Sequence, residues 1–291
     1  MYHNCRQLLE LSEARNMPIH EIVIENEMKN SGVGRDAVME TMRERYKIMR
    51  ASSEKALDRP RHTEGDLITG IASTQYRYSQ SGDTLCGEFI NTVMARALSC
   101  SEVNASMGKI CAMPTAGSCG IVPAVLITVG EKCHKTEDDI INALITASGV
   151  GAIVMENATV AGSEGGCQAE CGVAAAMAAA GAVKLKGGTP AMSIEAFSFA
   201  LINIMGLVCD PVAGLVQIPC AQRNASQAVN ALISADLALS GARFPIPADE
   251  VIDAMYKVGK LLPSQLKETA MGGVAATETA KSIEARIYGS K

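Results

Sequence analysis

Apolar residues recur every three to four positions along most of the chain, which is the spacing of one face of an α-helix. No alternating apolar and polar run is bounded by hairpin dipeptides, so strands are not expected. The predicted fold class is therefore all-α, a single and mostly helical globule with buried apolar helices and Gly-rich loops. The predicted helices cover residues 4–15, 18–29, 35–57, 83–107, 120–133, 137–155, 168–184, 190–208, 221–239, 248–261 and 278–287.

The longest apolar runs predict helices buried on all sides rather than membrane spans. Residues 173–183 give eleven uncharged positions and residues 144–155 give twelve. About 20 such positions are needed to cross the hydrocarbon core of a bilayer. Their content of Ala, Gly, Met and Ser suits close packing inside a helical domain, and we expect no membrane association.

One shift in composition marks the candidate domain boundary. Residues 59–70 include the run Arg-Pro-Arg-His-Thr-Glu-Gly-Asp, which is typical of a loop. This loop divides the chain into an N-terminal helical extension, residues 1–58, and a main domain, residues 59–291.

Charge and composition argue against nucleic-acid binding and for a reducing compartment. The net charge is -5, aromatic residues make up 3% of the chain and tryptophan is absent. Nucleic-acid binding needs basic grooves and aromatic stacking platforms, so it is not expected. Ten cysteines without a secretory signal at the N-terminus favour a reducing compartment, and we expect a cytoplasmic protein.

A loop rich in Gly, Ser and Thr, residues 114–120, precedes an apolar helix. Free backbone amides at a helix start, with the helix dipole behind them, can hold a carboxylate. The loop lacks the lysine of a P-loop and the glycine spacing of a dinucleotide site. An ordinary helix cap explains the loop equally well. The residues that would bind a substrate carboxylate are Thr115, Ala116, Gly117 and Ser118.

Cys167, Cys209 and Cys220 each lie at a break between apolar stretches that is marked by Gly or Pro. Thiolates are soft ligands that select iron-sulfur clusters, zinc or copper(I), and three of them leave one coordination position open. The alternative is that these cysteines are small buried hydrophobic residues. Spacing also leaves Cys171 open as a competing ligand.

Other cysteines and the histidines restrict the choice of metal. Cys111 and Cys119 lie on either side of the start of the Gly-rich loop and are equally ambiguous from spacing. The four histidines form no ligand pair, which disfavours a zinc site.

Three carboxylates lie next to these cysteines in sequence. Glu164 and Glu170 flank Cys167, and Asp210 directly follows Cys209. A carboxylate in a partly desolvated site has a raised pKa and can transfer a proton. The structural alternative is that Glu170 caps a helix and Asp210 begins a turn.

The segments around the cysteines closely resemble the iron-sulfur-dependent L-serine dehydratases, and in particular their alpha, cluster-bearing chain. The resemblance rests on Glu-Gly-Gly-Cys-Gln-Ala-Glu at 164–170, on the stretch at 209–220 and on Arg-Asn-Ala at 223–225. It extends over essentially the whole chain. Further matching stretches lie at 102–108, 114–118, 251–256, 268–269 and 272–273.

The resemblance implies that residues 59–291 form a catalytic domain that binds a 4Fe-4S cluster through Cys167, Cys209 and Cys220. One iron would lack a protein thiolate and act as a Lewis acid. The implied reaction converts L-serine to pyruvate and ammonia without pyridoxal phosphate, in amino-acid catabolism. A second lyase activity, that of an L-cysteine desulfidase-like enzyme, and a non-catalytic redox-sensing helical subunit are the rival interpretations.

The resemblance also implies a partner. The beta part of the family, with its Ser-Ser-Ser-His-Thr stretch, is missing from this sequence, so we expect a separate beta subunit and a hetero-oligomer. Weak or no activity is expected for the isolated chain. Some single-chain members end in a cysteine, whereas the last cysteine here is Cys220.

Overall fold

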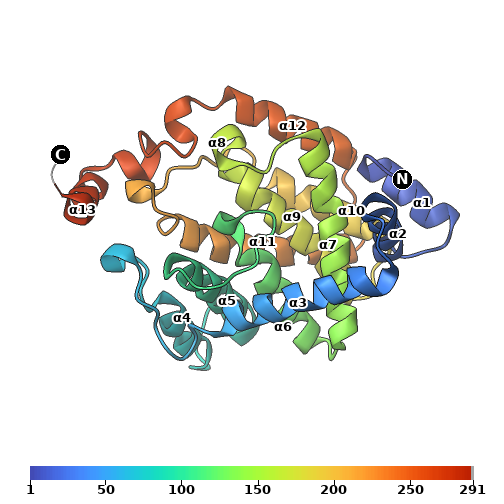
Figure 1. Cartoon of the computed structure of the whole chain (residues 1–291), viewed down its shortest axis with the longest axis horizontal. Coiled ribbons are helices and arrows are strands. Elements are labelled where there is room, and N and C mark those ends of the chain that lie inside the picture. The colour runs from blue at the N-terminus through green and yellow to red at the C-terminus, as the bar shows by residue number, and fades with distance from the viewer. Residues whose placement is uncertain (290–291) are drawn as a thin grey trace.

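The computed structural model describes residues 1–289 and shows a helical globule without β-strands in that range (Figure 1). The all-α prediction is confirmed. A single isolated parallel bridge joins Cys209 and Lys267. The helices are α1 (Cys5–Ala14), α2 (Ile19–Ser31), α3 (Arg35–Glu54), α4 (Ile71–Ser79), α5 (Gly87–Ala105), α6 (Ile121–Lys132), α7 (Glu137–Asn157), α8 (Gly162–Gly165), α9 (Val173–Leu185), α10 (Pro190–Ile202), α11 (Cys220–Leu239), α12 (Ala248–Leu261) and α13 (Glu278–Tyr288).

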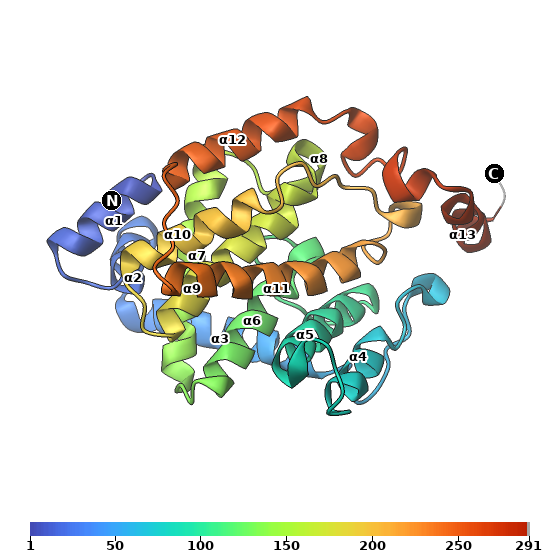
Figure 2. The same cartoon turned by 180° about the vertical axis from the view of Figure 1, so that it is seen from behind.

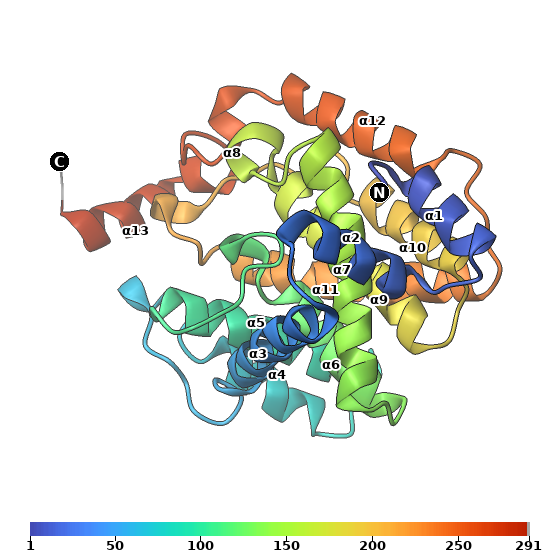
Figure 3. The same ribbon diagram turned by 45° about the vertical axis from the view of Figure 1, so that its right-hand side comes forward.

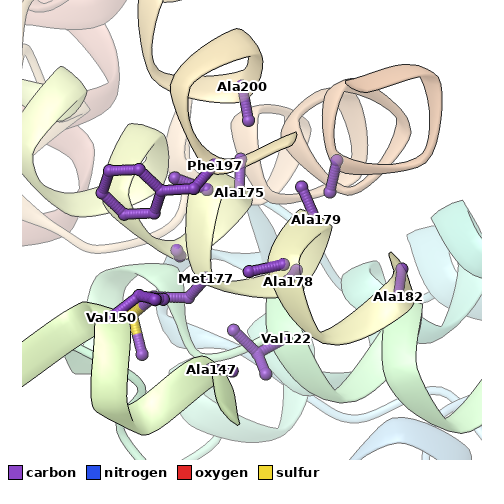
Figure 4. Packing of buried hydrophobic residues seen from close by; sticks show 14 of the residues in the cluster. Val122, Ala147, Val150, Ala175, Met177, Ala178, Ala179, Ala182, Phe197 and Ala200 are labelled. Atoms are coloured by element: carbon purple, nitrogen blue, oxygen red, sulfur yellow. The ribbon is translucent and has the colours of Figure 1, made fainter. Parts of the chain in front are cut away.

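Helix α9 forms the centre of the core. Every residue of α9 except Lys184 is buried, and α6, α7, α10 and α11 pack around it. Most of its side chains are methyl groups, which lets neighbouring backbones approach closely, and larger side chains such as Phe197 and Val150 fill the space between the helices (Figure 4). The predicted burial on all sides is confirmed for this helix.

Helix α7 is long and apolar enough to cross a membrane by length and composition alone. However, 67% of its most apolar window is buried inside the protein. Packing against α9 and α2 therefore accounts for its apolar character. Its start is fixed by a capping box, in which Thr136 and Asp139 satisfy each other's backbone amides.

The N-terminal helices contribute to the main core. Tyr2, Leu8 and Ile24 are buried in the same hydrophobic cluster as α9, and α3 lies along α5, α6 and α7 (Figure 3). The boundary between residues 58 and 59 stays a prediction.

The main differences from the predicted helices lie at α4 and at the end of α10, and the short α8 was not expected either. Helix α4 was not expected, because its sequence is mostly polar and only Ala72, Ser73 and Ser79 are buried, so it shows little apolar periodicity. The predicted helix at 190–208 ends at Ile202, and the chain then turns toward Cys209. In both cases tertiary contacts override the local pattern.

Gly181 tests the close packing of α9. A methyl group at this position would lie 3.0 Å from the carbonyl oxygen of Ala143 and 2.9 Å from a Leu126 methyl group. We expect Gly181→Ala to lower the free energy of unfolding by about 1–2 kcal/mol, because overpacking outweighs the gain of about 1 kcal/mol in helix propensity. Urea denaturation measures the difference.

Gly151 provides the matched control. The three heavy atoms nearest to a methyl group there all belong to the unbranched side chain of Met177. Gly151→Ala should therefore change the free energy of unfolding by less than about 1 kcal/mol, since the Met177 side chain can move aside. A Gly181→Ala variant as stable as Gly151→Ala would contradict the packing assigned to α9.

Candidate cluster site

The segment that carries Cys167 is a broken helix. Helix α8 ends at Gly166, whose φ of 77° is readily adopted by glycine, and a π-helical turn, Gln168–Gly172, leads from Cys167 into α9. A side chain at Gly166 would collide with the carbonyl oxygen of Leu207. Isolated π turns occur frequently at functional sites.

Gln168 joins this segment to the one that carries Cys209. Its fully buried amide Nε2 donates to the carbonyl oxygens of Gly165 (2.9 Å) and Met255 (3.0 Å), and its Oε1 accepts from the Gly206 amide (2.8 Å). The side chain thus satisfies the Gly165 carbonyl and the Gly206 amide, which lie where helices end, and ties them to Met255 in the middle of α12. It is a positioning residue that the sequence pattern did not reveal.

The backbone on both sides of Cys209 pairs with the segment after α12. The Cys209 amide donates to the Leu266 carbonyl (2.9 Å), and the Glu268 amide donates to the Cys209 carbonyl (2.7 Å). This pairing places Glu268 near the thiols. Burial, Glu170 and Cys167 raise the pKa of Cys209 most, and the charge of Glu268 raises it further. Glu268 is a second residue that the sequence pattern did not assign to the site.

Asp210 is buried and forms an ion pair with Arg223, whose Nη1 lies 2.8 Å from Oδ1. Its other carboxylate oxygen accepts a hydrogen bond from the Val274 amide at 2.6 Å. Gly273 lies so close to this oxygen that a side chain there would overlap it. These contacts of Asp210 hold the chain after Cys209 in place. The catalytic role predicted for Asp210 stays a prediction.

Cys220 begins α11, one helical turn before Asn224. The Asn224 amide Nδ2 donates to the carbonyl oxygens of Gly117 (2.7 Å) and Cys220 (2.9 Å), and its Oδ1 accepts from the Gly120 amide (2.9 Å). Asn224 is 1% exposed. It therefore fixes the Gly-rich loop against the helix that carries Cys220.

The three predicted cysteine ligands lie close enough to influence one another. Burial raises the pKa of Cys220 to about 12, with Cys167 as the next cause. Burial also raises the pKa of Cys209, and Glu170 and Cys167 act in the same direction. A hydrogen bond with Cys171 lowers the pKa of Cys167. These mutual influences place Cys167, Cys209 and Cys220 near one another, and we call the region that they and Glu170 occupy the thiol pocket; their role as ligands stays a prediction.

Glu170 is the predicted carboxylate that faces the thiols. The Cys209 thiol donates to its Oε2 at 3.9 Å, and a hydrogen bond from Thr115 also reaches this carboxylate. Burial, followed by the charge of Glu268, raises the pKa of Glu170 to about 6. Glu164, in contrast, is exposed on α8.

Glycines border the Glu170 carboxylate on two sides. A methyl group at Gly162 would lie 2.7 Å from Glu170 Oε2 and 3.0 Å from the Cys209 sulfur, and one at Gly117 would lie 3.4 Å from both carboxylate oxygens. Gly117 belongs to the loop predicted to bind a substrate carboxylate, in which Thr115 and Ser118 share a hydrogen bond of 3.1 Å. The loop therefore borders the thiol pocket, while substrate binding by Thr115, Ala116, Gly117 and Ser118 stays a prediction.

The donor set determines which metal centre the pocket fits. Within residues 1–289, no three His, Cys, Asp or Glu side chains converge as the ligands of a single metal ion would. The thiolates of an iron-sulfur cluster bind different irons and so lie farther apart than the ligands of one ion. A set of three thiols without histidine, of which Cys167 and Cys209 are buried and Cys220 is half-buried, fits a cluster better than zinc.

The fold defines the chain as an all-helical protein in which three cysteine-bearing segments lie next to one another. The family model described as serine dehydratase alpha chain matches residues 14–275. The chain belongs to this family.

Curated relatives agree with this assignment. The chain is 44% identical over 289 residues to the probable L-serine dehydratase alpha chain of Bacillus subtilis, covering 99% of this chain and 96% of that one. It is 45% identical over 283 residues to the L-serine dehydratase alpha chain of Peptoniphilus asaccharolyticus, covering 97% of each. The L-serine dehydratase of Haemophilus influenzae is 34% identical over 284 residues, which are 94% of this chain but 61% of that protein.

Asn224→Ala tests the attachment of the loop. The substitution leaves the half-buried Gly117 carbonyl and the buried Gly120 amide without their partner, so we expect a loss of about 1–3 kcal/mol in the free energy of unfolding. Proteolysis within residues 114–120 should become faster. The control is Gln222→Ala, an exposed position two residues earlier on α11. Equal stability of the two variants would show that Asn224 does not fix the loop.

Proposed function

We propose that this chain is the alpha subunit of an enzyme that converts L-serine to pyruvate and ammonia, with a 4Fe-4S cluster held by Cys167, Cys209 and Cys220. The observation that supports it most is the meeting of these three thiols around Glu170. The match to L-serine dehydratase alpha chains over nearly the full length supplies the reaction.

The cluster, when bound, supplies a Lewis acid that makes the serine hydroxyl a better leaving group. The chain itself supplies the surroundings. Glu170 is the carboxylate that points at the thiols, and we assign to it the proton transfer at the substrate. Asp210 holds the backbone after Cys209 through its ion pair with Arg223. Glu164 is exposed and lies farther from the reaction in this proposal.

We assign the serine carboxylate to the loop of Thr115, Ala116, Gly117 and Ser118. Two observations support this assignment. Asn224 holds the loop at the start of α11, beside Cys220. Gly117 lies directly against the Glu170 carboxylate, so the loop adjoins the group to which we assign proton transfer.

A separate beta subunit is part of the proposal. The two relatives that the chain matches over nearly their full length are named alpha chains, which supports a second, beta chain. Met107, Leu261 and Met271 are 94%, 82% and 68% exposed. We propose that the beta subunit covers these apolar side chains in a hetero-oligomer, in a reducing cytoplasm.

Cys209→Ser tests the ligand role. Replacing one thiolate should remove the visible absorption of the anaerobically reconstituted cluster and lower serine deamination by at least 100-fold, because the hydroxyl is a poor iron ligand. The helical circular dichroism should be unchanged. Iron and sulfide analysis on the complex with the beta subunit measures the first effect, and pyruvate release measures the second.

Cys86→Ser is the matched control, because Cys86 is exposed at the start of α5 and its loss should leave cluster and activity unchanged. Full activity of Cys209→Ser would refute the ligand role. Two further results would favour the rival functions. Sulfide release from L-cysteine in preference to pyruvate release from L-serine would indicate a desulfidase, and a cluster whose spectrum does not respond to serine would indicate a redox sensor.

The isolated chain tests the need for the beta subunit. We expect serine deamination to be at least ten-fold lower for the chain alone than for the co-expressed pair, because the apolar side chains that the beta subunit would cover stay exposed to water. Mixing the two purified subunits should restore the rate. Equal rates for the lone chain and the pair would contradict the proposal.

A further inference from the structure

The loop after α12 is tied to the segment that carries Cys209. The backbone of Cys209 pairs with it on both sides, through the Leu266 carbonyl at 2.9 Å and the Glu268 amide at 2.7 Å. We call residues 264–274 the Glu268 loop. Figure 2 shows this part of the chain, between α12 and α13, beside the chain that leads into α11.

Further contacts hold the Glu268 loop on both sides of Glu268. The Thr269 hydroxyl donates to the Ser264 carbonyl at 3.1 Å, which closes the loop on itself. At its far end, the Val274 amide donates to the Asp210 carboxylate at 2.6 Å. The backbone position of Glu268 is therefore determined by the fold.

Glu268 has a left-handed backbone conformation, with a φ of 62°, and Ala270 follows with a φ of 55°. Residues with a side chain adopt such values uncommonly, and they do so frequently at functional sites. The loop thus has a glutamate where a glycine would fit the backbone more easily. This indicates that the Glu268 side chain has a function.

The negative charge of Glu268 acts on the thiol pocket. Burial raises the pKa of Glu170 most, and the charge of Glu268 is the next cause. The same charge adds to the raised pKa of Cys209 and of Cys220, for both of which burial, Glu170 and Cys167 weigh more. The carboxylate is exposed, and no ion pair within residues 1–289 includes it.

The charges of the pocket favour a cationic group of the substrate. Arg223 is paired with Asp210, so its charge is already balanced. Glu268 adds a carboxylate that no side chain of the described residues balances. L-serine carries a carboxylate, a hydroxymethyl group and an ammonium group on one carbon. Of these three, only the ammonium group has no partner among the residues already assigned to the site.

We propose that the Glu268 carboxylate binds the ammonium group of the substrate, an inference that rests on the proposed function. The carboxylate of L-serine then lies at residues 115–118, the hydroxymethyl group points toward the cysteines, and the α hydrogen is left to Glu170. A fixed place for each of three substituents distinguishes the two enantiomers. A charge-assisted hydrogen bond to the ammonium group also selects amino acids over hydroxy acids of the same size.

Glu268→Gln tests this contact in the cluster-loaded complex with the beta subunit. The KM for L-serine should rise about ten-fold to 100-fold, because a neutral amide replaces the charged partner, and kcat should be unchanged. 3-Hydroxypropionate is L-serine without its ammonium group. It should inhibit the variant and the unchanged enzyme with equal inhibition constants, which separates loss of the ammonium contact from a general change in the loop.

Glu278→Gln is the matched control, because Glu278 is an exposed carboxylate at the start of α13. Its substitution should leave the KM for L-serine, kcat and the inhibition constant of 3-hydroxypropionate unchanged. Iron content and circular dichroism should be the same for both variants and the unchanged enzyme.

Three results for Glu268→Gln would overturn the inference. The first is an unchanged KM for L-serine. The second is an equal rise in this KM and in the inhibition constant of 3-hydroxypropionate, which would indicate a distorted loop. The third is a lower kcat at constant KM, which would assign Glu268 to proton transfer. Failure of the unchanged enzyme to deaminate L-serine would refute the proposed function itself, and this inference with it.

Discussion

The pocket depends on satisfying the backbone groups that are freed where helices break inside the protein. Cysteines can converge only if several chain segments end or turn at one place, and each break leaves amides and carbonyls without helical partners. Buried groups of this kind cost about 1–3 kcal/mol each when they are not hydrogen-bonded. The amide side chains of Gln168 and Asn224 meet this demand, each with three hydrogen bonds to backbone atoms.

The same two side chains set the relative positions of the thiols. Gln168 adjoins Cys167 and bonds to Gly206, close to Cys209, whereas Asn224 links Cys220 to the Gly-rich loop. Arg223 and Asp210 add an ion pair between the Cys209 and Cys220 segments. The pocket is therefore a set of loops that are tied to one another, and the central helix α9 gives them a rigid base.

Much of this arrangement could be predicted from the sequence. The apolar periodicity indicated an all-helical fold, and Gly and Pro beside Cys167, Cys209 and Cys220 marked the breaks at which they lie. Gln168 and Asn224 could not be recognised, because their partners lie up to 107 residues away and a polar side chain gives no sign of what it will bind. Glu268 was missed for the same reason, since a backbone pairing with Cys209 brings it to the pocket.

The helices that carry the pocket also connect it to the far side of the molecule. Helix α9 starts at the π turn after Cys167, and α11 starts at Cys220. The two helices then pack against each other through the core. Because protein interiors are close-packed, a substitution in this shared core can shift the helix ends that carry Cys167 and Cys220 without touching either cysteine. The positions of the thiols therefore depend on packing far from them in the sequence as well as on their own loops.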